Sequence, residues 1–135
     1  MIEVTKKPIS PELVVNQIKT DSSGCVVTYI GLIREYSRGK QVLSVEYKDT
    51  QQTAEGRLQE IASEIRQKWQ PNNIAICHRT GTLKVGDINL VVAIAAAHRK
   101  EGLAACQYAI DRFKQKLPTW KKETYKDGST WVEGE

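Results

Sequence analysis

The segment FKQKLPTWKKE, residues 113–123, places four lysines around one proline and one tryptophan. On a helical wheel of about 100° per residue, Lys114 lies about 20° from Leu103, at the edge of an apolar stripe in the last predicted helix. Pro118 ends that helix, so we expect Lys121 on the following turn, where it can fold back toward Lys114. Two close ammonium groups lower each other's pKa or share one anion. The pair is therefore a candidate site for an anionic ligand, at which a lysine acts as nucleophile, acid or electrostatic catalyst.

The same lysines also fit a solvated helix end. A lysine at the edge of an apolar stripe usually keeps its stem buried and its ammonium group in water. Lys116, Lys122 and Lys126 have no position that sets them apart, and we expect them to be solvated. From the sequence alone, both interpretations of Lys114 stay open.

Arginine and histidine side chains follow two of the predicted strands. His98 and Arg99 come directly after the longest apolar run, and Arg34 comes after the first long strand. Ligand groups are common at strand ends, and a guanidinium fork can donate two hydrogen bonds to a phosphate. In the competing interpretation, the arginine is an ordinary surface residue and the histidine beside it makes hydrogen bonds that serve only the structure.

The sequence contains no motif for a metal or a cofactor. The two histidines, His78 and His98, are far apart, and no glycine-rich phosphate loop of the usual kinds occurs. His78 and Arg79 lie within a predicted strand and have a weaker claim to a site. The three cysteines form no CxxC pair, which suggests neither a disulfide framework nor a thiolate site. We therefore expect no bound metal, no cofactor and a reducing compartment.

Size and composition indicate a single domain over residues 1–135. A chain of 135 residues can bury one core, and 40% hydrophobic with 27% charged residues is typical of a globular protein. The net charge of +4 favours anionic partners, but positive and negative residues are mixed along the chain. The charge is therefore compatible with nucleic-acid binding without indicating it. The start of the chain lacks the apolar core of a signal peptide, and no apolar run is long enough to span a membrane. We expect a cytoplasmic protein.

The hydrophobic pattern predicts three helices and six strands. Helices are expected over residues 11–19, 53–70 and 103–117, and strands over 25–33, 41–48, 74–80 and 88–98, with a C-terminal hairpin turning at Asp127-Gly128. We expect the first two strands to form a hairpin, and the strand at 88–98, apolar on both faces, to be central. The last helix is expected to bury Leu103, Cys106, Ile110, Phe113 and Leu117. Because the elements do not alternate strictly, an α+β fold around a mostly antiparallel sheet is favoured.

Several segments resemble one known family in their order and spacing. They are YIGLIRE from Tyr29, HRTGTLKVGD from His78, AAAHRKEG from Ala95, KLPTWKKE from Lys116 and DGSTWVE from Asp127. Together they resemble the large, catalytic subunit of molybdopterin synthase over nearly the whole chain. The AHR and PxWKKE segments are the most specific. The stretch EYKDTQQTA at 46–54 departs from the family pattern, so contacts attributed to that stretch are not transferred.

The resemblance implies an α/β-hammerhead-like α+β fold with added strands, and a homodimer at the centre of a heterotetramer. Each large subunit of the family binds a small ubiquitin-like sulfur carrier. The carrier's C-terminal Gly-Gly tail bears a thiocarboxylate and enters a pocket of the large subunit. Two sulfur atoms then pass in succession to cyclic pyranopterin monophosphate, which forms the dithiolene of molybdopterin. The implied activity is that of a sulfurtransferase.

Matched position by position, the family's active-site lysines fall on Lys114 and Lys121. The matched positions that look like substrate-pocket groups are Tyr29, Arg34, His98 and Arg99. Cationic groups suit this chemistry because the phosphate, the thiocarboxylate and the charged intermediate are all anionic. The resemblance does not say which lysine moves protons, nor whether the His-Arg pair serves its own subunit's pocket or the neighbour's.

Two other classes of function compete with this one. A small basic domain could bind nucleic acid or another polyanion, with a steep salt dependence. Aromatic content of 7%, without basic and aromatic residues interleaved on one strand, counts against that class. The other class is an inactive, partner-binding homologue, and the presence of every matched cationic residue opposes it.

Overall fold

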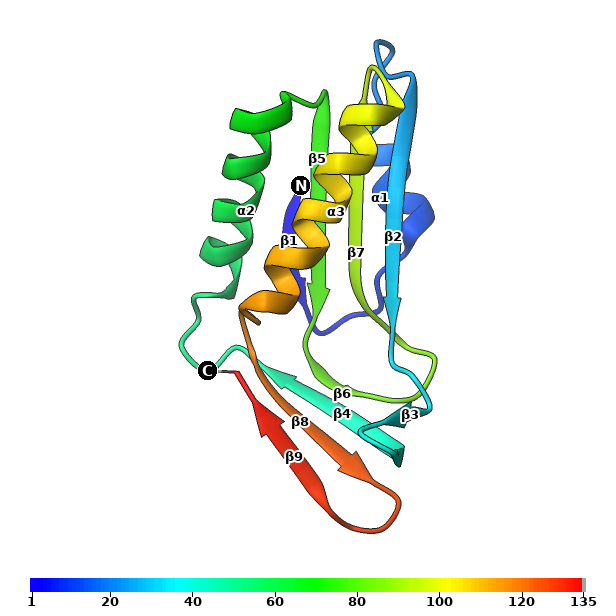
Figure 1. Ribbon diagram of the computed structural model, residues 1–135, viewed down its shortest axis with the longest axis vertical. Helices are drawn as coiled ribbons and strands as arrows, with labels where there is room; N and C mark the ends of the chain where they lie inside the picture. Colours follow the sequence, from blue (N-terminus) through cyan, green and yellow to red (C-terminus); the bar gives the residue numbers. More distant parts are fainter. Residues whose placement is uncertain (135) are drawn as a thin grey trace.

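The chain forms two β-sheets, one above the other, and three helices (Figure 1). The structure is a computed structural model that describes residues 1–134. The helices are α1 (Pro11–Ile18), α2 (Ala54–Trp69) and α3 (Arg99–Gln115). The strands are β1 (Ile2–Thr5), β2 (Cys25–Leu32), β3 (Tyr36–Ser37), β4 (Lys40–Lys48), β5 (Asn73–Arg79), β6 (Gly81–Leu83), β7 (Ile88–Ala96), β8 (Trp120–Tyr125) and β9 (Thr130–Glu133). The predicted α+β class, with three helices and mostly antiparallel strands, is confirmed.

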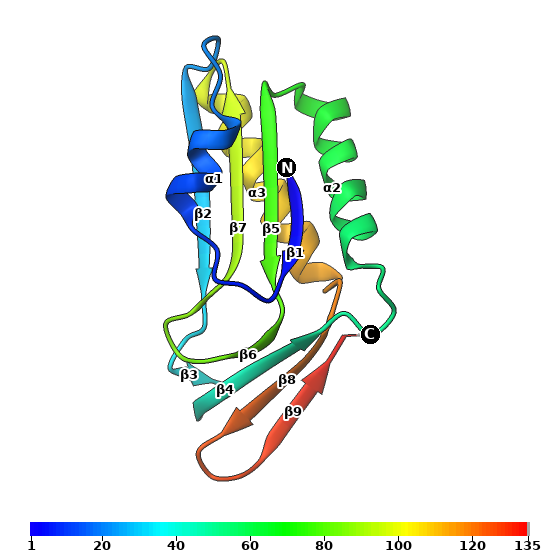
Figure 2. The same ribbon diagram turned by 180° about the vertical axis from the view of Figure 1, so that it is seen from behind.

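The four-stranded sheet, which contains the long strands β2, β5 and β7 and is called the larger sheet below, has the strand order β1-β5-β7-β2. Strand β7 is antiparallel to both of its neighbours and is buried from Leu90 to Ala96, as predicted for a central strand. It is apolar on both faces because α2 and α3 cover one face (Figure 1) and α1 covers the other (Figure 2). Strand β1, which pairs parallel to β5, was not predicted, since four residues carry too short a pattern.

Helices α1 and α2 follow their sequence signals. Ser10 Oγ accepts a hydrogen bond from the Leu13 amide at 3.3 Å, and Pro11 is the first helical residue. In α2, the apolar residues at helical spacing are buried as predicted: Ala54, Leu58, Ile61, Ala62 and Ile65. Both helices therefore bury one face against the larger sheet.

Helix α3 begins earlier than predicted, and its buried face is rotated from the predicted stripe, although Cys106 and Phe113 are buried as predicted. It starts at Arg99 instead of Leu103, so residues 99–102 are its first turn and not a break. The buried face contains Gly102, Ala105 and Ala109, whereas Leu103 is 57% exposed. These small residues let the helix lie close to the sheet: a Cβ on Gly102 would stand 3.0 Å from a Val27 methyl group. Close packing of small residues, which a hydrophobicity pattern underweights, thus sets the rotation of α3.

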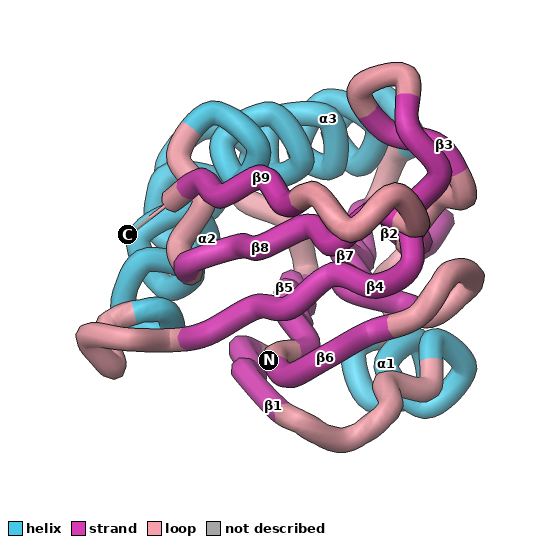
Figure 3. The backbone as a smooth tube through the Cα atoms, turned by 90° about the horizontal axis from the view of Figure 1, so that it is seen from below, coloured by secondary structure: helices cyan, strands magenta, loops and turns pink. Residues whose placement is uncertain are grey.

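The other sheet, called the smaller sheet below, has five mostly shorter strands, and four of them have the order β3-β4-β8-β9. The fifth strand, β6, pairs with residues 45–47 of β4 on the edge opposite β8 (Figure 3). The predicted hairpin between β2 and β4 is wrong, because β2 pairs with β7 and β4 pairs with β8. The turn at Arg38-Gly39 instead joins the short strand β3 to β4. The predicted C-terminal hairpin is confirmed as β8–β9, with Gly128 at a φ of 88° in its turn.

Apolar contacts connect the two sheets. Leu117, just after α3, packs against both the core under the helices and the core of the smaller sheet. The end of α3 is therefore held where the two sheets meet. Within residues 1–134, no helix is long and apolar enough to cross a membrane.

Candidate active site

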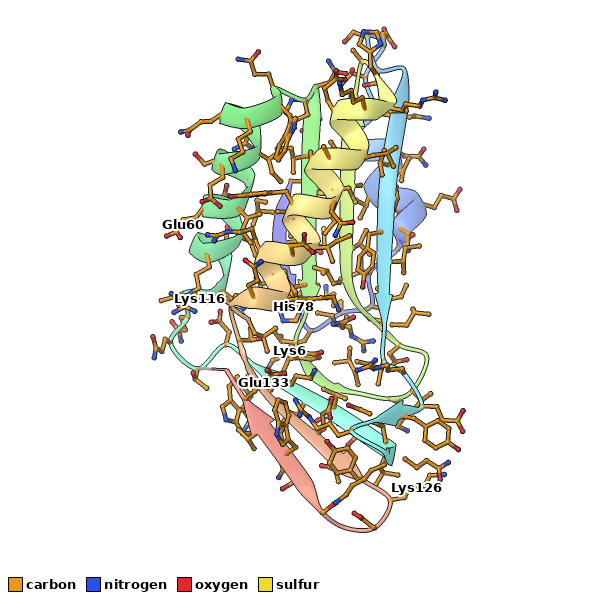
Figure 4. The ribbon with its side chains drawn as sticks, in the orientation of Figure 1. Lys6, Glu60, His78, Lys116, Lys126 and Glu133 are labelled. Atoms are coloured by element: carbon orange, nitrogen blue, oxygen red, sulfur yellow. The ribbon has the colours of Figure 1, made fainter. Side chains whose placement is uncertain are left out.

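A cavity of about 320 Å³ lies where the larger sheet meets the smaller one. Strands β2, β4, β7 and β8, together with the last turn of α3, supply its walls. Figure 4 shows the side chains that fill the region between the two sheets. Buried apolar residues form part of the lining: Ile33, Val42, Val45, Leu90 and Phe113. Three of the predicted cationic residues line the same cavity: Arg34, Lys114 and Lys121.

Arg34 reaches the cavity because β2 leaves the sheet just before it. The register of β2 against β7 shifts between Gly31 and Leu32, and the Ile33 amide then donates to the Asp87 carbonyl at 2.9 Å. A side chain at position 31 would meet Asn89 Oδ1 at 2.9 Å, so glycine fits this close approach. Arg34 follows on the exposed rim of the cavity.

Lys114 lies in the last turn of α3. Its neighbour Phe113 is buried and fixes this turn against the core, while Lys114 itself is exposed at the cavity wall. Leu103, its neighbour on the helical wheel, is exposed too, because the buried stripe is rotated. The partial desolvation that one interpretation of Lys114 required is therefore not present in this single chain.

Lys121 lies in strand β8, and not on a turn as predicted. The chain re-enters the smaller sheet two residues after Pro118, so Lys121 pairs with Tyr47 of β4 and Glu133 of β9. Its side chain is 21% exposed, with Nζ 3.4 Å from Glu123 and 3.5 Å from Glu133. Nζ also lies 6.0 Å from the centre of the Tyr47 ring. The ammonium group is thus held against the cavity wall by two carboxylates and one aromatic ring.

Glu123 is a buried carboxylate in the cavity wall, and the sequence analysis did not identify it. It accepts hydrogen bonds from Tyr125 at 2.6 Å and from Ser37 at 2.9 Å. Burial opposes ionisation of this carboxyl, but those two hydrogen bonds and Lys121 outweigh burial and lower its pKa. A signal was present in the sequence: alternate residues of a strand share one face, so Lys121, Glu123 and Tyr125 point the same way once residues 120–125 are read as a strand.

The cavity carries more positive than negative charge. Glu123 balances Lys121, whereas within the described residues neither Arg34 nor Lys114 forms an ion pair. Tyr29 lines the cavity as predicted, beside the core under the helices. In residues 1–134 no group of three acidic, histidine or cysteine side chains is arranged to hold a metal. The arrangement can therefore bind an anion and stabilise negative charge that develops in a reaction.

The structure does not bring His98 and Arg99 to this cavity. They follow β7, whereas Arg34 follows β2, and the two strands are antiparallel with Cys25 opposite Ala96. The C-terminal ends of two neighbouring antiparallel strands lie at opposite ends of the sheet. Within a single chain, Arg34 therefore does not share a cavity with His98 and Arg99, and their predicted role in a substrate pocket stays a prediction. His98 and Arg99 are exposed at the start of α3, and Lys114 lies at the other end of that helix.

Fold and cavity together define an α+β protein with a cavity between its two sheets that Arg34, Lys114 and Lys121 line. A family model described as "MoaE protein" matches residues 4–116. The molybdopterin synthase catalytic subunit of Bacillus subtilis is 38% identical over 130 residues, which cover 96% of this chain and 83% of that protein. The human molybdopterin synthase catalytic subunit is 37% identical over 131 residues, covering 97% of this chain and 70% of that protein. The chain therefore belongs to the MoaE protein family, to which the resemblance pointed.

Solved structures agree with this assignment. Molybdopterin synthase from Staphylococcus aureus matches with a TM-score of 0.90 and 34% identity, over 98% of this chain and 96% of that one. A complex of subunits 1 and 2 of the molybdopterin-converting factor from Helicobacter pylori matches with a TM-score of 0.75, over 93% of this chain and 86% of that one. The identity there is 12%, so this second likeness concerns the fold alone.

Proposed function

We propose that this chain is the sulfur-transferring subunit of a molybdopterin synthase, with cyclic pyranopterin monophosphate as its substrate. The observation that carries the proposal is the convergence of Arg34, Lys114 and Lys121 on one cavity in a chain of this family. The S. aureus and H. pylori structures are described as a synthase and as a two-subunit complex. We infer a small sulfur-carrier subunit as the partner here, with a C-terminal Gly-Gly thiocarboxylate that enters the cavity.

The proposed chemistry uses the carrier's thiocarboxylate as the sulfur donor and water as the final acyl acceptor. The thiocarboxylate sulfur bonds to a carbon of the substrate and displaces an oxygen substituent from it, so the carbon–oxygen bond breaks and the leaving oxygen takes up a proton. Carrier and substrate are then joined through an acyl–sulfur link. Water adds to the acyl carbon, and the tetrahedral species collapses by breaking the bond between the acyl carbon and the sulfur. The sulfur stays on the substrate, and the carrier leaves with an ordinary carboxylate. A second carrier repeats these steps to complete the dithiolene.

The cationic residues have separate tasks in this proposal. Lys121, held by Glu123, orients the thiocarboxylate and stabilises the oxyanion of the tetrahedral species. Lys114 has no carboxylate partner among the described residues and is free to meet an incoming anion or to move a proton. Arg34 binds the cyclic phosphate at the cavity rim, and Tyr29 lines the space for the pterin.

We infer that His98 and Arg99 act in the cavity of a neighbouring subunit. In their own chain they lie at the far end of the larger sheet from Arg34, yet both are exposed. A symmetric homodimer can bring the start of one α3 helix to the cavity of the other chain. The proposed assembly is therefore a central homodimer with one carrier at each end, a cytoplasmic heterotetramer.

The test of this function is reconstitution. The purified protein is mixed with thiocarboxylated carrier and cyclic pyranopterin monophosphate, and the dithiolene product and the carrier's mass are followed together. We expect product to form while the carrier's thiocarboxylate becomes a carboxylate, and no product from a carrier that ends in an ordinary carboxylate. A protein that neither binds the carrier nor forms product is not this synthase subunit.

A further inference from the structure

His78, which the proposed chemistry does not use, lies fully buried where the two sheets meet (Figure 4). Its imidazole ring contacts two aromatic rings edge to face, those of Tyr47 and Phe113, each with a centroid distance of 5.0 Å. Both of these residues line the cavity. His78 is thus packed directly behind the candidate active site.

Both ring nitrogens of His78 have hydrogen-bond partners. Nδ1 lies 2.9 Å from the Asn89 carbonyl oxygen, and Nε2 lies 2.9 Å from Thr119 Oγ1. A carbonyl oxygen only accepts, so Nδ1 carries the proton and donates it. In the neutral ring Nε2 is then an acceptor, and the Thr119 hydroxyl donates to it. The buried histidine therefore has one defined tautomer and no unsatisfied nitrogen.

These contacts connect His78 to the segments that carry both lysines. Thr119, also fully buried, immediately precedes β8 and stands two residues before Lys121. Tyr47 is the residue of β4 that pairs with Lys121 across the sheet. Phe113 immediately precedes Lys114 in the last turn of α3. His78 thus contacts the residue before Lys114, the segment that precedes Lys121 and the residue paired with Lys121 across the sheet.

We propose that His78 is a positioning residue that fixes the start of β8 through Thr119, and so sets where Lys121 stands relative to Lys114. Without the Thr119 hydrogen bond, the link between α3 and β8 has one fewer fixed point on the larger sheet. Burial lowers the pKa of His78 to about 4, so Nε2 remains a hydrogen-bond acceptor at neutral pH. Displacement of a catalytic group by about 1 Å can cost up to roughly 100-fold in rate.

The decisive variants separate the hydroxyl of Thr119 from its methyl group. Thr119→Val replaces the hydroxyl by a methyl group at nearly the same size and removes the hydrogen bond, whereas Thr119→Ser keeps the hydroxyl and its hydrogen bond and loses the methyl group. Thr80→Val is the matched control, because Thr80 is a buried threonine two residues from His78 that does not line the cavity. His78→Phe keeps an aromatic ring and loses both hydrogen bonds, so it provides a second way to break the same link.

Two readouts are needed, and the first does not depend on activity. The ammonium signals of Lys114 and Lys121 are followed by NMR in protein labelled at lysine, with assignments from Lys114→Arg and Lys121→Arg. We expect Thr119→Val and His78→Phe to shift the Lys121 signal, and Thr119→Ser and Thr80→Val to leave it in place. The imidazole nitrogen shifts of the wild-type protein are expected to show the tautomer with hydrogen on Nδ1.

The second readout is sulfur transfer, and it rests on the proposed function. We expect Thr119→Val to lower kcat by about tenfold while KM for the carrier changes by less than about twofold. A Lys121 signal and a kcat that both stay at the wild-type values in Thr119→Val would overturn the inference, as would the opposite tautomer of His78. If the wild-type protein transfers no sulfur but the Lys121 signal still responds, the proposed function fails and the positioning role stands.

Discussion

Lys121 and Glu123 form an ion pair of 3.4 Å on one face of strand β8, inside the wall of the candidate active site. Glu123 is the fixed member of the pair, since Tyr125 and Ser37 also donate hydrogen bonds to it. Lys121 has a second carboxylate partner in Glu133, at 3.5 Å, on the neighbouring strand β9. A buried carboxylate therefore anchors the cation at the point where the proposed reaction develops negative charge.

Replacing Glu123 should be costly for stability, and replacing Glu133 should not. Glu123→Ala removes the buried partner of Lys121 and leaves two donors unsatisfied, so we expect the free energy of unfolding to fall by roughly 3 kcal/mol. Glu133→Ala is the matched control, because it also pairs with Lys121 but has a side chain 43% exposed, and should cost less than about 1 kcal/mol. Urea denaturation measures both. Equal losses would show that Glu123 does not anchor the site.

The pH dependence of stability should show a component from His78. Burial lowers its pKa from 6.5 to about 4, although the Asn89 carbonyl and Asp49 favour the charged form. Between these two pH values His78 is protonated in the unfolded chain and neutral in the folded protein. The free energy of unfolding therefore falls as the pH drops from about 6.5 to about 4. The expected loss is roughly 3 kcal/mol, and His78→Gln should abolish that part of the profile. Identical slopes for both proteins across this window would contradict the assignment.

Glu123 should contribute in a separate and more acidic window. Its folded-state pKa is lowered, so its stabilising effect is present above the ordinary value of 4.5 and is lost as the pH falls through the folded pKa. Comparison of wild type with Glu123→Gln below pH 4.5 isolates this contribution. A wild-type profile that stays flat there relative to the variant would show that the carboxylate gains nothing from its partners.

If His98 and Arg99 complete the neighbouring cavity, two inactive variants should restore each other. Neither Lys121→Ala nor His98→Ala alone is expected to be active. Co-expressed in equal amounts, they form mixed dimers in which one of the two cavities has only native residues, giving about a quarter of the wild-type activity. No recovery, with mixed dimers shown to be present, would place His98 in the cavity of its own chain or outside any site.

Arg34 should matter for substrate binding more than for turnover. Arg34→Ala removes charge-assisted hydrogen bonds to a phosphate, so we expect KM for cyclic pyranopterin monophosphate to rise by roughly tenfold or more. Arg112 is the control, because it is ion-paired with Glu64 at 3.2 Å and does not line the cavity. A KM that rises equally in Arg112→Ala would indicate a general effect of net charge.

Local patterns predicted the helices and the longer strands, but neither the short strands β1, β3 and β6 nor how the strands pair. The helical spacing in α2, the Ser-Pro start of α1 and the apolar run of β7 were interpreted correctly because each depends on neighbours in the chain. The partner of β2 depends on contacts more than fifty residues away, such as Cys25 opposite Ala96, which no local pattern encodes. The same holds for α3, whose buried face depends on how closely Gly102 approaches Val27.

The candidate site was partly predictable for the same reason. Lys114 and Lys121 stood out through a helical wheel, Pro118 and the family resemblance, and the structure places both at one cavity. Glu123 was missed because Lys121 was placed on a turn, so the strand alternation of residues 120–125 was not considered, and because Ser37, which hydrogen-bonds to Glu123, lies far away in the chain. His98 and Arg34 were each singled out because they follow strands, and the antiparallel direction of those two strands, which no local pattern encodes, places them at opposite ends of the sheet.

The most direct test of the central claim is single-turnover sulfur transfer from a thiocarboxylated carrier by wild type, Lys114→Ala, Lys121→Ala and Lys126→Ala. Lys126 is exposed near the β8–β9 turn, away from the cavity (Figure 4), and serves as the control. We expect both cavity variants to bind the carrier but to transfer sulfur at least about 100-fold more slowly, with Lys126→Ala unchanged. Wild-type rates in Lys114→Ala and Lys121→Ala would contradict the account and leave both lysines without a role in sulfur transfer.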